Sequence, residues 1–463
     1  MAMHKSTRVE KDSFGSIEVP EDALYGAQTM RALIHFPIGD DIMPKGLIES
    51  YLILKKAAAI VNHRLGILPE DKKKLIVQAC DSLLEDVPMR NFPIKIWQTG
   101  SGTQTNMNVN EVIANQAIRL SGGTLGSKDP IHPNDHVNMS QSSNDSFPTA
   151  MHLAIARSTH KKLFPALNAL KQSLKKKEHE FKEVLKIGRT HLQDAVPMTL
   201  GQEFSGYVSL IERNIHRIQM ALQGIYELAI GGTAIGTGLN APKGFSEHVC
   251  DLLAEMTHLP FCAHPNKFAA MSCHDEIVFF SGTLRTLACS LMKIGNDIRF
   301  LGSGPRCGLQ ELILPKNEPG SSIMPGKVNP TQAEAMTMVA AQVLGADQTI
   351  ALAGSQGNFE LNVYKPVILY NTMLMIDILS DTCEVFSKYC IEGIGVNTKK
   401  LKQNVQDSLM LVTALSVHIG YDKSAQIAKY AYENQTTLKE AGVKLGFLTA
   451  AEFDQWVKPE KMV

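Results

Sequence analysis

The sequence lacks a charge imbalance, paired cysteines and a long apolar run. Its 463 residues carry 46 Lys and Arg against 46 Asp and Glu, a formal net charge of +0. A neutral chain has no overall field that steers it to nucleic acid or to an anionic membrane, so neither is expected as a partner. No apolar run approaches the roughly 20 residues that a membrane helix needs. A local basic site for a small anion remains compatible with this balance.

The N-terminus and the cysteines exclude further classes. The stretch MAMHKSTRVEKDSFGS has no apolar core for a signal peptide, and it carries acids early, unlike a transit peptide. The 8 cysteines never form a C-x-x-C pair, and several stand among apolar residues. Buried free thiols in a reducing compartment are therefore favoured over disulfides or a zinc site. We expect a cytoplasmic protein.

The chain has a helical periodicity of apolar residues. Its 44% hydrophobic residues provide enough apolar side chains for a large core. Apolar residues recur at intervals of three and four, as in Val208, Ile211, Ile215, Ile218 and Leu222. Such sustained spacing predicts long helices that cross at shallow angles in an elongated bundle. We place five of them near residues 147–186, 200–230, 268–301, 330–354 and 364–392.

Three domains follow from this pattern. We predict a mixed, mostly helical N-terminal domain over residues 1–142, in which short helices alternate with turns rich in Gly and Asn. The long-helix bundle occupies residues 143–392, and a small helical domain occupies residues 393–463. The expected fold class is mainly α.

Four polar segments interrupt the helical pattern. They are TGSGTQTNMN at 99–108, HPNDHVNMSQSSND at 132–145, GRTHLQD at 188–194 and GSSIMPGKVNPTQ at 320–332. Each alone is also an ordinary solvated loop or cap, since Gly, Ser, Asn and Asp are turn formers. The last three, however, precede long helices, whose N-termini offer unpaired N–H groups and a partial positive charge. The pattern predicts a site for a small carboxylate or phosphate.

The segment at 320–332 ends in the signals of a helix start, with Asn329 as the N-cap and Pro330 at the first helical position. It does not fit a phosphate-binding P-loop. Pro325 stands where that motif needs glycine, and Val328 stands where it needs Ser or Thr.

Two other patterns are weak. GGTAIGTG at 231–238 follows a helix rather than a strand, which disfavours a dinucleotide site. His132, Asp135 and His136 could be metal ligands, but a short acid–histidine cluster beside a proline is more often a capped turn. A metal site is the less favoured alternative here.

The length of the first predicted helix bears on assembly. It spans about 40 residues, so its ends would lie roughly 55–60 Å apart. SSND at 142–145 stands at one end and GRTHLQD at the other. If both segments serve one site, they must come from different chains. We therefore expect a homo-oligomer whose sites are assembled between subunits.

Several blocks resemble the fumarase/aspartase superfamily. They are SFGSIEVPEDALYGAQT, WQTGSGTQTNMNVNEVI, HPND, SQSSND, GRTHLQDAVP, GGTAIGTGLN and GSSIMPGKVNP, in this order, and GYDKSAQIAKYA resembles the family's small C-terminal domain. Gly326 followed by PTQ is similar to the class II fumarate hydratases, whereas aspartate ammonia-lyases tend to carry alanine at that position.

The resemblance implies a three-domain subunit with a central five-helix bundle, and a homotetramer with a twenty-helix core and active sites built from three subunits. It implies the reversible, stereospecific hydration of fumarate to (S)-malate, a step of the tricarboxylic acid cycle. The chemistry would be acid/base catalysis through an aci-carboxylate intermediate, with no metal and no organic cofactor. An aspartate ammonia-lyase on the same scaffold and a non-catalytic structural member of the superfamily are the alternatives.

The resemblance also implies residue roles. Ser321 would remove the C3 proton of malate, and His191, with Glu334 as its partner, would be the other acid/base group. The implied substrate-binding positions are Ser101, Gly102, Thr103, Ser142, Ser143, Asn144, Thr190, Ser322, Lys327, Val328 and Asn329. A second, non-catalytic anion site is implied at His132, Pro133, Asn134 and Asp135. The chain departs from the family just before this site, where Asp129 and Pro130 stand, and Lys128 is the candidate basic partner.

Overall fold

The computed structural model describes residues 6–463, which form two compact units. The first unit comprises residues up to 165, 215–288 and 341–380, and the second comprises 166–214, 289–340 and 381–463. Both are mainly helical, which confirms the predicted fold class. The predicted domains 1–142, 143–392 and 393–463 divide the chain differently and stay a prediction. The expectation about a signal peptide rests in part on residues 1–5, which lie outside the described residues.

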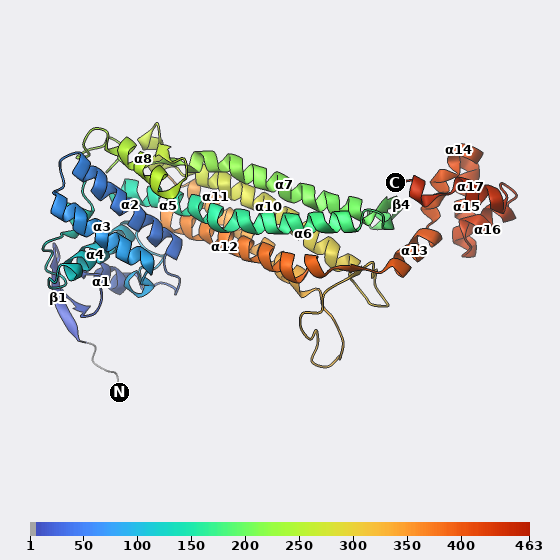
Figure 1. Cartoon of the computed structure of the whole chain (residues 1–463), viewed down its shortest axis with the longest axis horizontal. Coiled ribbons are helices and arrows are strands. Elements are labelled where there is room, and N and C mark those ends of the chain that lie inside the picture. The colour runs from blue at the N-terminus through green and yellow to red at the C-terminus, as the bar shows by residue number, and fades with distance from the viewer. Residues whose placement is uncertain (1–5) are drawn as a thin grey trace. The chain divides into compact units, whose positions relative to one another are not determined.

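Within residues 6–463, five long helical segments are present, as predicted (Figure 1). The first consists of α5, a π-helical turn η3 and α6. Helix α5 spans Ser143–Ser158, η3 spans Thr159–Leu163 and α6 spans Phe164–Glu180. The other four segments are α7 Leu200–Ile225, α10 Asp275–Leu301, α11 Thr331–Gly354 and α12 Lys365–Tyr389.

Three of the five segments end or begin well inside their predicted bounds, and α7 stops at Ile225 rather than near residue 230. The first segment ends at Glu180, and Leu185, predicted to be helical, begins the strand β3. The segment predicted at 268–301 is broken at Cys273, whose backbone is extended, so a short helix α9 (Lys267–Ser272) precedes α10. Apolar spacing continues across both breaks, which is why periodicity alone missed them.

The long helices pack through their apolar stripes in each unit. On α7, the predicted stripe residues Ile211, Ile218 and Leu222 are at most 1% exposed. In the first unit, Ser281 Oγ donates to Asp347 Oδ1 at 2.6 Å and joins α10 to α11. Further polar contacts join helices in the second unit, namely Tyr207 to Asp297 at 3.0 Å and Ser387 to Ser173 at 2.9 Å.

The first unit also holds the N-terminal elements and three elements between α7 and α10. They are β1 Thr7–Asp12, β2 Gly15–Pro20, α1 Ala27–His35, α2 Lys45–Arg64, α3 Glu70–Glu85, η1 Met89–Asn91, α4 Thr103–Leu120, η2 Pro133–Val137, β5 Glu227–Leu228, α8 Phe245–Thr257 and β6 Cys262–Ala263. The prediction of short helices is wrong for α2 and α4. In the asparagine-rich stretch, which is helical, the buried Asn106 amide has a partner, since Lys55 Nζ donates to Asn106 Oδ1 at 2.8 Å.

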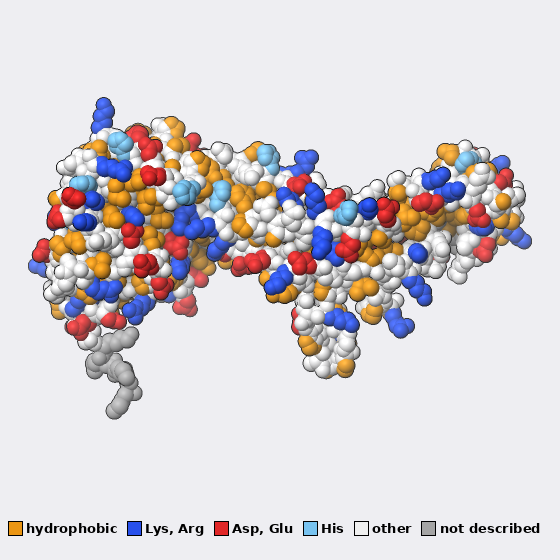
Figure 2. Space-filling model, in the orientation of Figure 1, with side chains coloured by type: hydrophobic (Ala, Val, Ile, Leu, Met, Phe, Trp, Pro, Cys, Tyr) orange, Lys and Arg blue, Asp and Glu red, His pale blue; other side chains and the backbone are white. Residues whose placement is uncertain are grey.

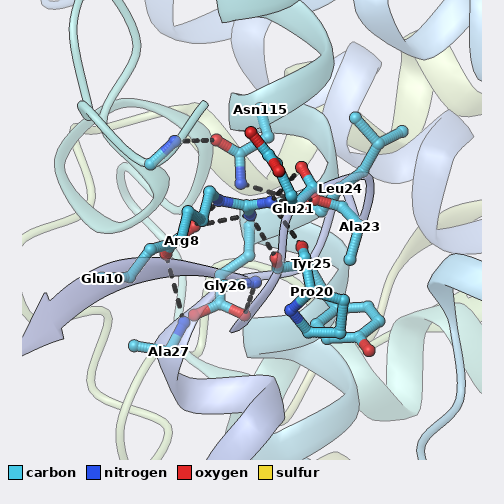
Figure 3. Close-up of polar contacts among 12 residues, drawn as sticks. Arg8, Glu10, Pro20, Glu21, Ala23, Leu24, Tyr25, Gly26, Ala27 and Asn115 are labelled. Carbon is cyan, nitrogen blue, oxygen red and sulfur yellow. Dashed lines mark hydrogen bonds and ion pairs between the residues drawn. The ribbon is translucent and has the colours of Figure 1, made fainter. Parts of the chain in front are cut away.

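One arginine organises the start of the chain (Figure 3). Arg8, on β1, donates to the Glu10 carboxylate at 2.6 Å and 2.9 Å. Its guanidinium also donates to four backbone carbonyls, those of Pro20, Glu21, Ala23 and Tyr25. These bonds fix the segment between β2 and α1, and three of the four carbonyls, those of Glu21, Ala23 and Tyr25, lie outside any sheet or helix.

The second unit adds two small sheets and the C-terminal helices. Strand β3 (Leu185–Thr190) pairs with β4 (Gln193–Thr199), and β7 (Leu312–Ile313) pairs with β8 (Gly395–Val396). The remaining elements are η4 Ile391–Gly393, α13 Thr398–Asp407, η5 Leu409–Ala414, α14 Ser416–Ile419, α15 Tyr421–Asn434, α16 Leu438–Lys444, α17 Ala450–Trp456 and η6 Pro459–Lys461. Leu415, Ile427 and Ala441 lie at the centre of a hydrophobic cluster formed by these C-terminal elements.

Helix α10 corrects one expectation from the sequence. By length and composition alone it is apolar enough to cross a membrane, with a mean hydropathy of 1.4, and half of that window is buried inside the chain. The core helices of water-soluble proteins pass the same test, so one such helix is weak support for a membrane span. The prediction that no apolar run approaches the length of a membrane helix therefore does not hold for α10.

Candidate active site

Three hydroxyl groups lie in a row in the first unit. Ser101 Oγ is 2.9 Å from Thr103 Oγ1, which is 2.6 Å from Ser143 Oγ. Gly102, between the first two, has a φ of 78°, and a Cβ there would lie 2.0 Å from Phe147, so only glycine fits. The structure thus brings together two predicted substrate-binding segments, at the start of α4 and the start of α5.

Asp145 ties the start of α5 to a third segment of the first unit. Its Oδ1 accepts a hydrogen bond from the Ser142 N–H at 2.8 Å and closes a capping box. Its Oδ2 accepts from the N–H groups of Gly231 and Thr233, at 2.9 Å and 3.0 Å. The glycine-rich stretch at 231–238 therefore supports the serine and asparagine side chains of the candidate site.

Asn144 is held by the same stretch. Its Nδ2 donates to the carbonyl of Ala234 at 2.8 Å, which fixes the orientation of the side-chain amide. With the Nδ2 hydrogen bonded on this side, the amide is presented as a fixed group rather than a free rotor. A fixed amide suits recognition of a substrate carboxylate.

Two buried ionisable side chains, Asp145 and Lys55, support these segments. Burial raises the pKa of Asp145 to about 6, although its bonds from three backbone N–H groups act in the opposite direction. Burial lowers the pKa of Lys55 to about 7. Its ammonium group donates to the Asn106 and Asn138 side chains at 2.8 Å and 2.9 Å. The site therefore rests on a hydrogen-bonded polar network, which fixes side-chain positions better than apolar packing alone.

His191 lies at the tip of a hairpin in the second unit. Thr190 pairs with Gln193, so His191 and Leu192 form a two-residue turn between β3 and β4. Both turn residues have positive φ, 58° and 61°, as this hairpin turn requires. The side chains of Thr190 and His191 are exposed. Within residues 6–463 of one chain, no side-chain hydrogen bond or ion pair holds the His191 ring.

Ser321 lies in an exposed loop of the second unit. Its Oγ accepts hydrogen bonds from the backbone N–H groups of Ile323 and Met324, at 3.3 Å and 3.2 Å. The neighbouring Ser322 is exposed and offers its hydroxyl to solvent. Two N–H donors aimed at one hydroxyl oxygen stabilise negative charge on that oxygen.

Asn329 closes this loop. Its Nδ2 donates to the Gly320 carbonyl at 2.6 Å, and the Gly320 N–H donates to the Lys327 carbonyl at 3.1 Å. Helix α11 begins at Thr331, and within the described residues no bond from its first turn reaches the Asn329 side chain. The predicted side-chain N-cap at Asn329 is therefore not formed, and the amide nitrogen of this residue instead donates at the base of the loop.

The other predicted groups of this loop face solvent. Lys327 and Val328 are exposed, and Glu334 is exposed in the first turn of α11. Among the contacts made by residues 6–463 of one chain, none joins Glu334 to His191. Their partnership stays a prediction.

The implied second anion site lies in the first unit, at the π-helical turn η2. His132 Nδ1 accepts from the N–H groups of Asn134 and Asp135 at 3.2 Å and 3.1 Å, so the ring caps the turn. Lys128 Nζ donates to the Lys11 carbonyl at 2.7 Å. His132, Pro133 and Asn134 line a cavity that is also lined by the carboxylates of Glu10, Asp12 and Glu111. These acids weigh against an anion there, and the second site stays a prediction.

All eight cysteines are free thiols, four of them buried, namely Cys80, Cys250, Cys383 and Cys390. Burial raises the pKa of Cys383 to about 12, which makes this thiol unreactive. Residues 6–463 contain no group of three or more His, Cys, Asp or Glu side chains arranged for a metal ion.

Sequence reasoning missed two supporting groups. The sequence analysis assigns no role to Asp145, although Ser142 three residues before it is a readable capping-box signal. It also does not predict the hairpin around His191, although Gly188 and Pro197 disfavour a helix there.

Comparison with known proteins places the chain in a family. Residues 15–345 match the family described as lyase, and residues 411–463 match the family described as fumarase C C-terminus. Fumarate hydratase class II of Thermosynechococcus vestitus is 59% identical over 461 residues, covering 100% of this chain and 99% of the relative. The mitochondrial fumarate hydratase of Homo sapiens is 56% identical and covers 100% and 91%. The crystal structure of a class II fumarase from Schistosoma mansoni, 46% identical, aligns with a TM-score of 0.96 over 99% of both chains. The chain belongs to the class II fumarate hydratase family of lyases.

Proposed function

We propose that the protein catalyses the reversible, stereospecific hydration of fumarate to (S)-malate, as a step of the tricarboxylic acid cycle. Full-length identity to enzymes named fumarate hydratase supports this function. The observation that carries it is the Ser321 loop, in which two backbone N–H groups point at one serine oxygen.

Ser321 is the proposed base for the C3 proton of malate. A serine hydroxyl is a poor base at its usual high pKa, but N–H donors stabilise its alkoxide and so lower that pKa. The donors from Ile323 and Met324 act in this way without any other chain. The exposed residues on either side give the loop freedom to close over substrate and exclude water.

Removal of this proton places a second negative charge on the adjacent carboxylate. Lys327 and Asn329 are the proposed donors to that aci-carboxylate, together with the loop N–H groups. Positive charge and fixed donors at this point stabilise the transition state more than the bound substrate. The hydroxyl groups of Ser101, Thr103 and Ser143 and the fixed Asn144 amide are the proposed contacts to the substrate carboxylates.

His191 is the proposed acid/base group on the other side of the reaction. An imidazole titrates near neutral pH, so it can protonate a leaving hydroxide or activate a water molecule. Glu334 of another chain is its proposed partner, because the exposed ring has no partner among the described residues of its own chain. A carboxylate there would orient the ring and stabilise its protonated form.

We propose a homotetramer in which three subunits contribute to each site. The binding groups at 101–103 and 142–144 belong to one unit of the chain, whereas those at 190–191 and 320–334 belong to the other. Large apolar side chains are exposed on the bundle helices of a single chain, including Phe279 on α10 and Met338 on α11, which are 59% and 68% exposed. Figure 2 shows hydrophobic side chains open to solvent on the face it displays. Such surface marks a protein interface.

We also propose a cytoplasmic location. Relatives of similar identity include proteins named as mitochondrial and proteins from bacteria.

The decisive experiment follows the ultraviolet absorbance of fumarate with malate and, separately, with aspartate. Formation of fumarate from malate but not from aspartate supports the proposal. Fumarate formed from aspartate, with none from malate, would indicate the alternative ammonia-lyase. No turnover of either substrate by the folded protein would favour a non-catalytic member of the superfamily.

A further inference from the structure

A buried carboxylate, Glu311, lies at the base of the hairpin that carries His191. Its side chain is 0% exposed, and its Oε1 accepts from Arg189 Nη2 at 2.5 Å. Lys186 Nζ lies 3.1 Å from Oε2 and forms an ion pair with it. Both basic residues belong to β3, where the register shifts between Ile187 and Arg189. Because side chains alternate along a strand, this irregularity is what lets residues three apart reach one carboxylate.

Glu311 also joins segments beyond the hairpin. Its N–H donates to the carbonyl of Leu301 at the end of α10, at 2.8 Å, and its carbonyl accepts from the Asn397 N–H at 3.0 Å. Its Oε1 accepts a further hydrogen bond from Asn404 Nδ2 at 3.3 Å. The chain continues from here into the loop that carries Ser321. One residue thus fixes the hairpin against the segment that leads to the proposed base.

The charges around Glu311 are balanced. Lys186, only 1% exposed, lies between Glu311 and Glu203, and its Nζ is 2.7 Å from a Glu203 oxygen. Burial raises the pKa of Glu311, but the hydrogen bond from Arg189 and the charge of Lys186 outweigh it, so the pKa lies below its usual range. The contacts are therefore charge-assisted hydrogen bonds and ion pairs, which are shorter and more directional than neutral ones.

We propose that Glu311 is a positioning residue, which sets the direction of the His191 ring by holding Arg189. The turn that carries the ring is strained, since His191 and Leu192 both have positive φ. Strained turns persist only where the surrounding structure holds them. Only Thr190 separates Arg189 from His191, so a displacement of the guanidinium moves the turn directly. The inference rests on the proposed acid/base function of His191 and deepens it by naming what orients that group.

The test compares Glu311→Gln with Glu203→Gln in the full-length protein. Each variant removes one carboxylate charge from the same cluster, but only the first frees Arg189. For Glu311→Gln we expect kcat per folded protein to fall about 10- to 100-fold, with KM within about threefold, since a small displacement of a reacting group costs this much. For Glu203→Gln we expect kcat within about twofold of the parent protein. Equal losses of kcat in both variants would show a general stabilising role and overturn the proposal.

Two further measurements keep the proposal testable where Glu311→Gln does not fold. Arg189→Lys keeps the positive charge but loses the forked geometry, so we expect a smaller fall in kcat from a fully folded protein. Unchanged kcat in this variant would overturn the proposal. Amide hydrogen exchange over residues 185–199 should be faster in Arg189→Lys than in Glu203→Gln, and equal exchange would also count against it. The exchange measurement does not depend on turnover, whereas absence of malate turnover in the parent protein would reject the proposed function instead.

Discussion

At the scale of single residues, the local geometry of Ser321 leads to the first prediction. Ser321→Ala removes the hydroxyl oxygen to which the N–H groups of Ile323 and Met324 donate. We expect kcat for fumarate hydration to fall about 100- to 10,000-fold, the usual contribution of a general base, with little change in substrate affinity. Steady-state kinetics in both directions measure this. Near-normal kcat would remove Ser321 from the role of base.

Lys327 carries a separate prediction about charge. Lys327→Ala should weaken binding of both fumarate and malate, and it should add about 3–4 kcal/mol to the barrier of the chemical step. Lys327→Arg, which keeps the charge, is the matched control and should lose less. Binding of succinate, which cannot react, separates affinity from catalysis. Unchanged affinity for all three dicarboxylates in Lys327→Ala would exclude its role as a carboxylate clamp.

His152 predicts a pH dependence of stability. Burial lowers its pKa to about 4 in the folded chain, and its Nδ1 lies 3.0 Å from the Ile225 carbonyl. Below the ordinary histidine pKa of about 6.5, His152 binds a proton in the unfolded chain but stays neutral in the folded chain. The contribution of His152 to stability is therefore fully present above pH 6.5 and is lost as the pH falls toward 4. Between pH 7 and pH 5 this one residue should cost about 2 kcal/mol.

The measurement for His152 is the free energy of unfolding in denaturant at both pH values. The difference between pH 7 and pH 5 should be smaller in His152→Gln than in the parent protein, because glutamine takes up no proton. An equal difference in the two proteins would show that His152 does not contribute.

At the scale of elements, the sequence predicted the helices far better than the connections. The starts of α7, α11 and α12 lie within one residue of their predicted positions. The buried apolar residues of these helices leave a helical period that can be read in the sequence. The β3–β4 hairpin was missed because Leu185 continues the apolar spacing of α6. Arg189 and Lys186 of this hairpin pair with Glu311, which is distant in sequence, and such a contact leaves no local pattern to read.

The candidate site shows the same limit. Ser101, Thr103 and Ser143 could be named from the sequence because their segments resemble blocks of the superfamily. The contacts of Asp145 to Gly231 and Thr233 could not be foreseen, since they join segments about 90 residues apart and no local rule pairs such segments.

The approach of two segments to each other gives the element-scale prediction. Gly100 lies against the segment before α12, where a Cβ would be 1.5 Å from the Val363 carbonyl oxygen, and its own carbonyl accepts from the Lys365 N–H at 3.1 Å. Gly100→Ala should therefore displace the start of α4 and cost about 2–3 kcal/mol of stability. Gly206→Ala, on α7, has nothing within 4 Å and is the control, with a change of about 1 kcal/mol or less. Equal thermal midpoints for the two variants would contradict the close approach.

At the scale of the whole molecule, the proposed homotetramer with shared sites makes a prediction about mixed chains. Asn144 and His191 lie in different units of the chain, so variants at these positions damage different contributions to a site. In a homotetramer, a damaged contribution from one chain can be combined with an intact one from another.

This leads to the last prediction. Asn144→Ala and His191→Asn chains, each inactive when refolded alone, should regain activity when they are unfolded, mixed in equal amounts and refolded together. If the two contributions come from different chains and assembly is random, about one site in four receives both intact, so about a quarter of the parent activity should return. Each variant refolded alone is the control, and the refolded mixture must elute as a tetramer. A tetrameric mixture that stays inactive would mean that one chain supplies both residues to each site.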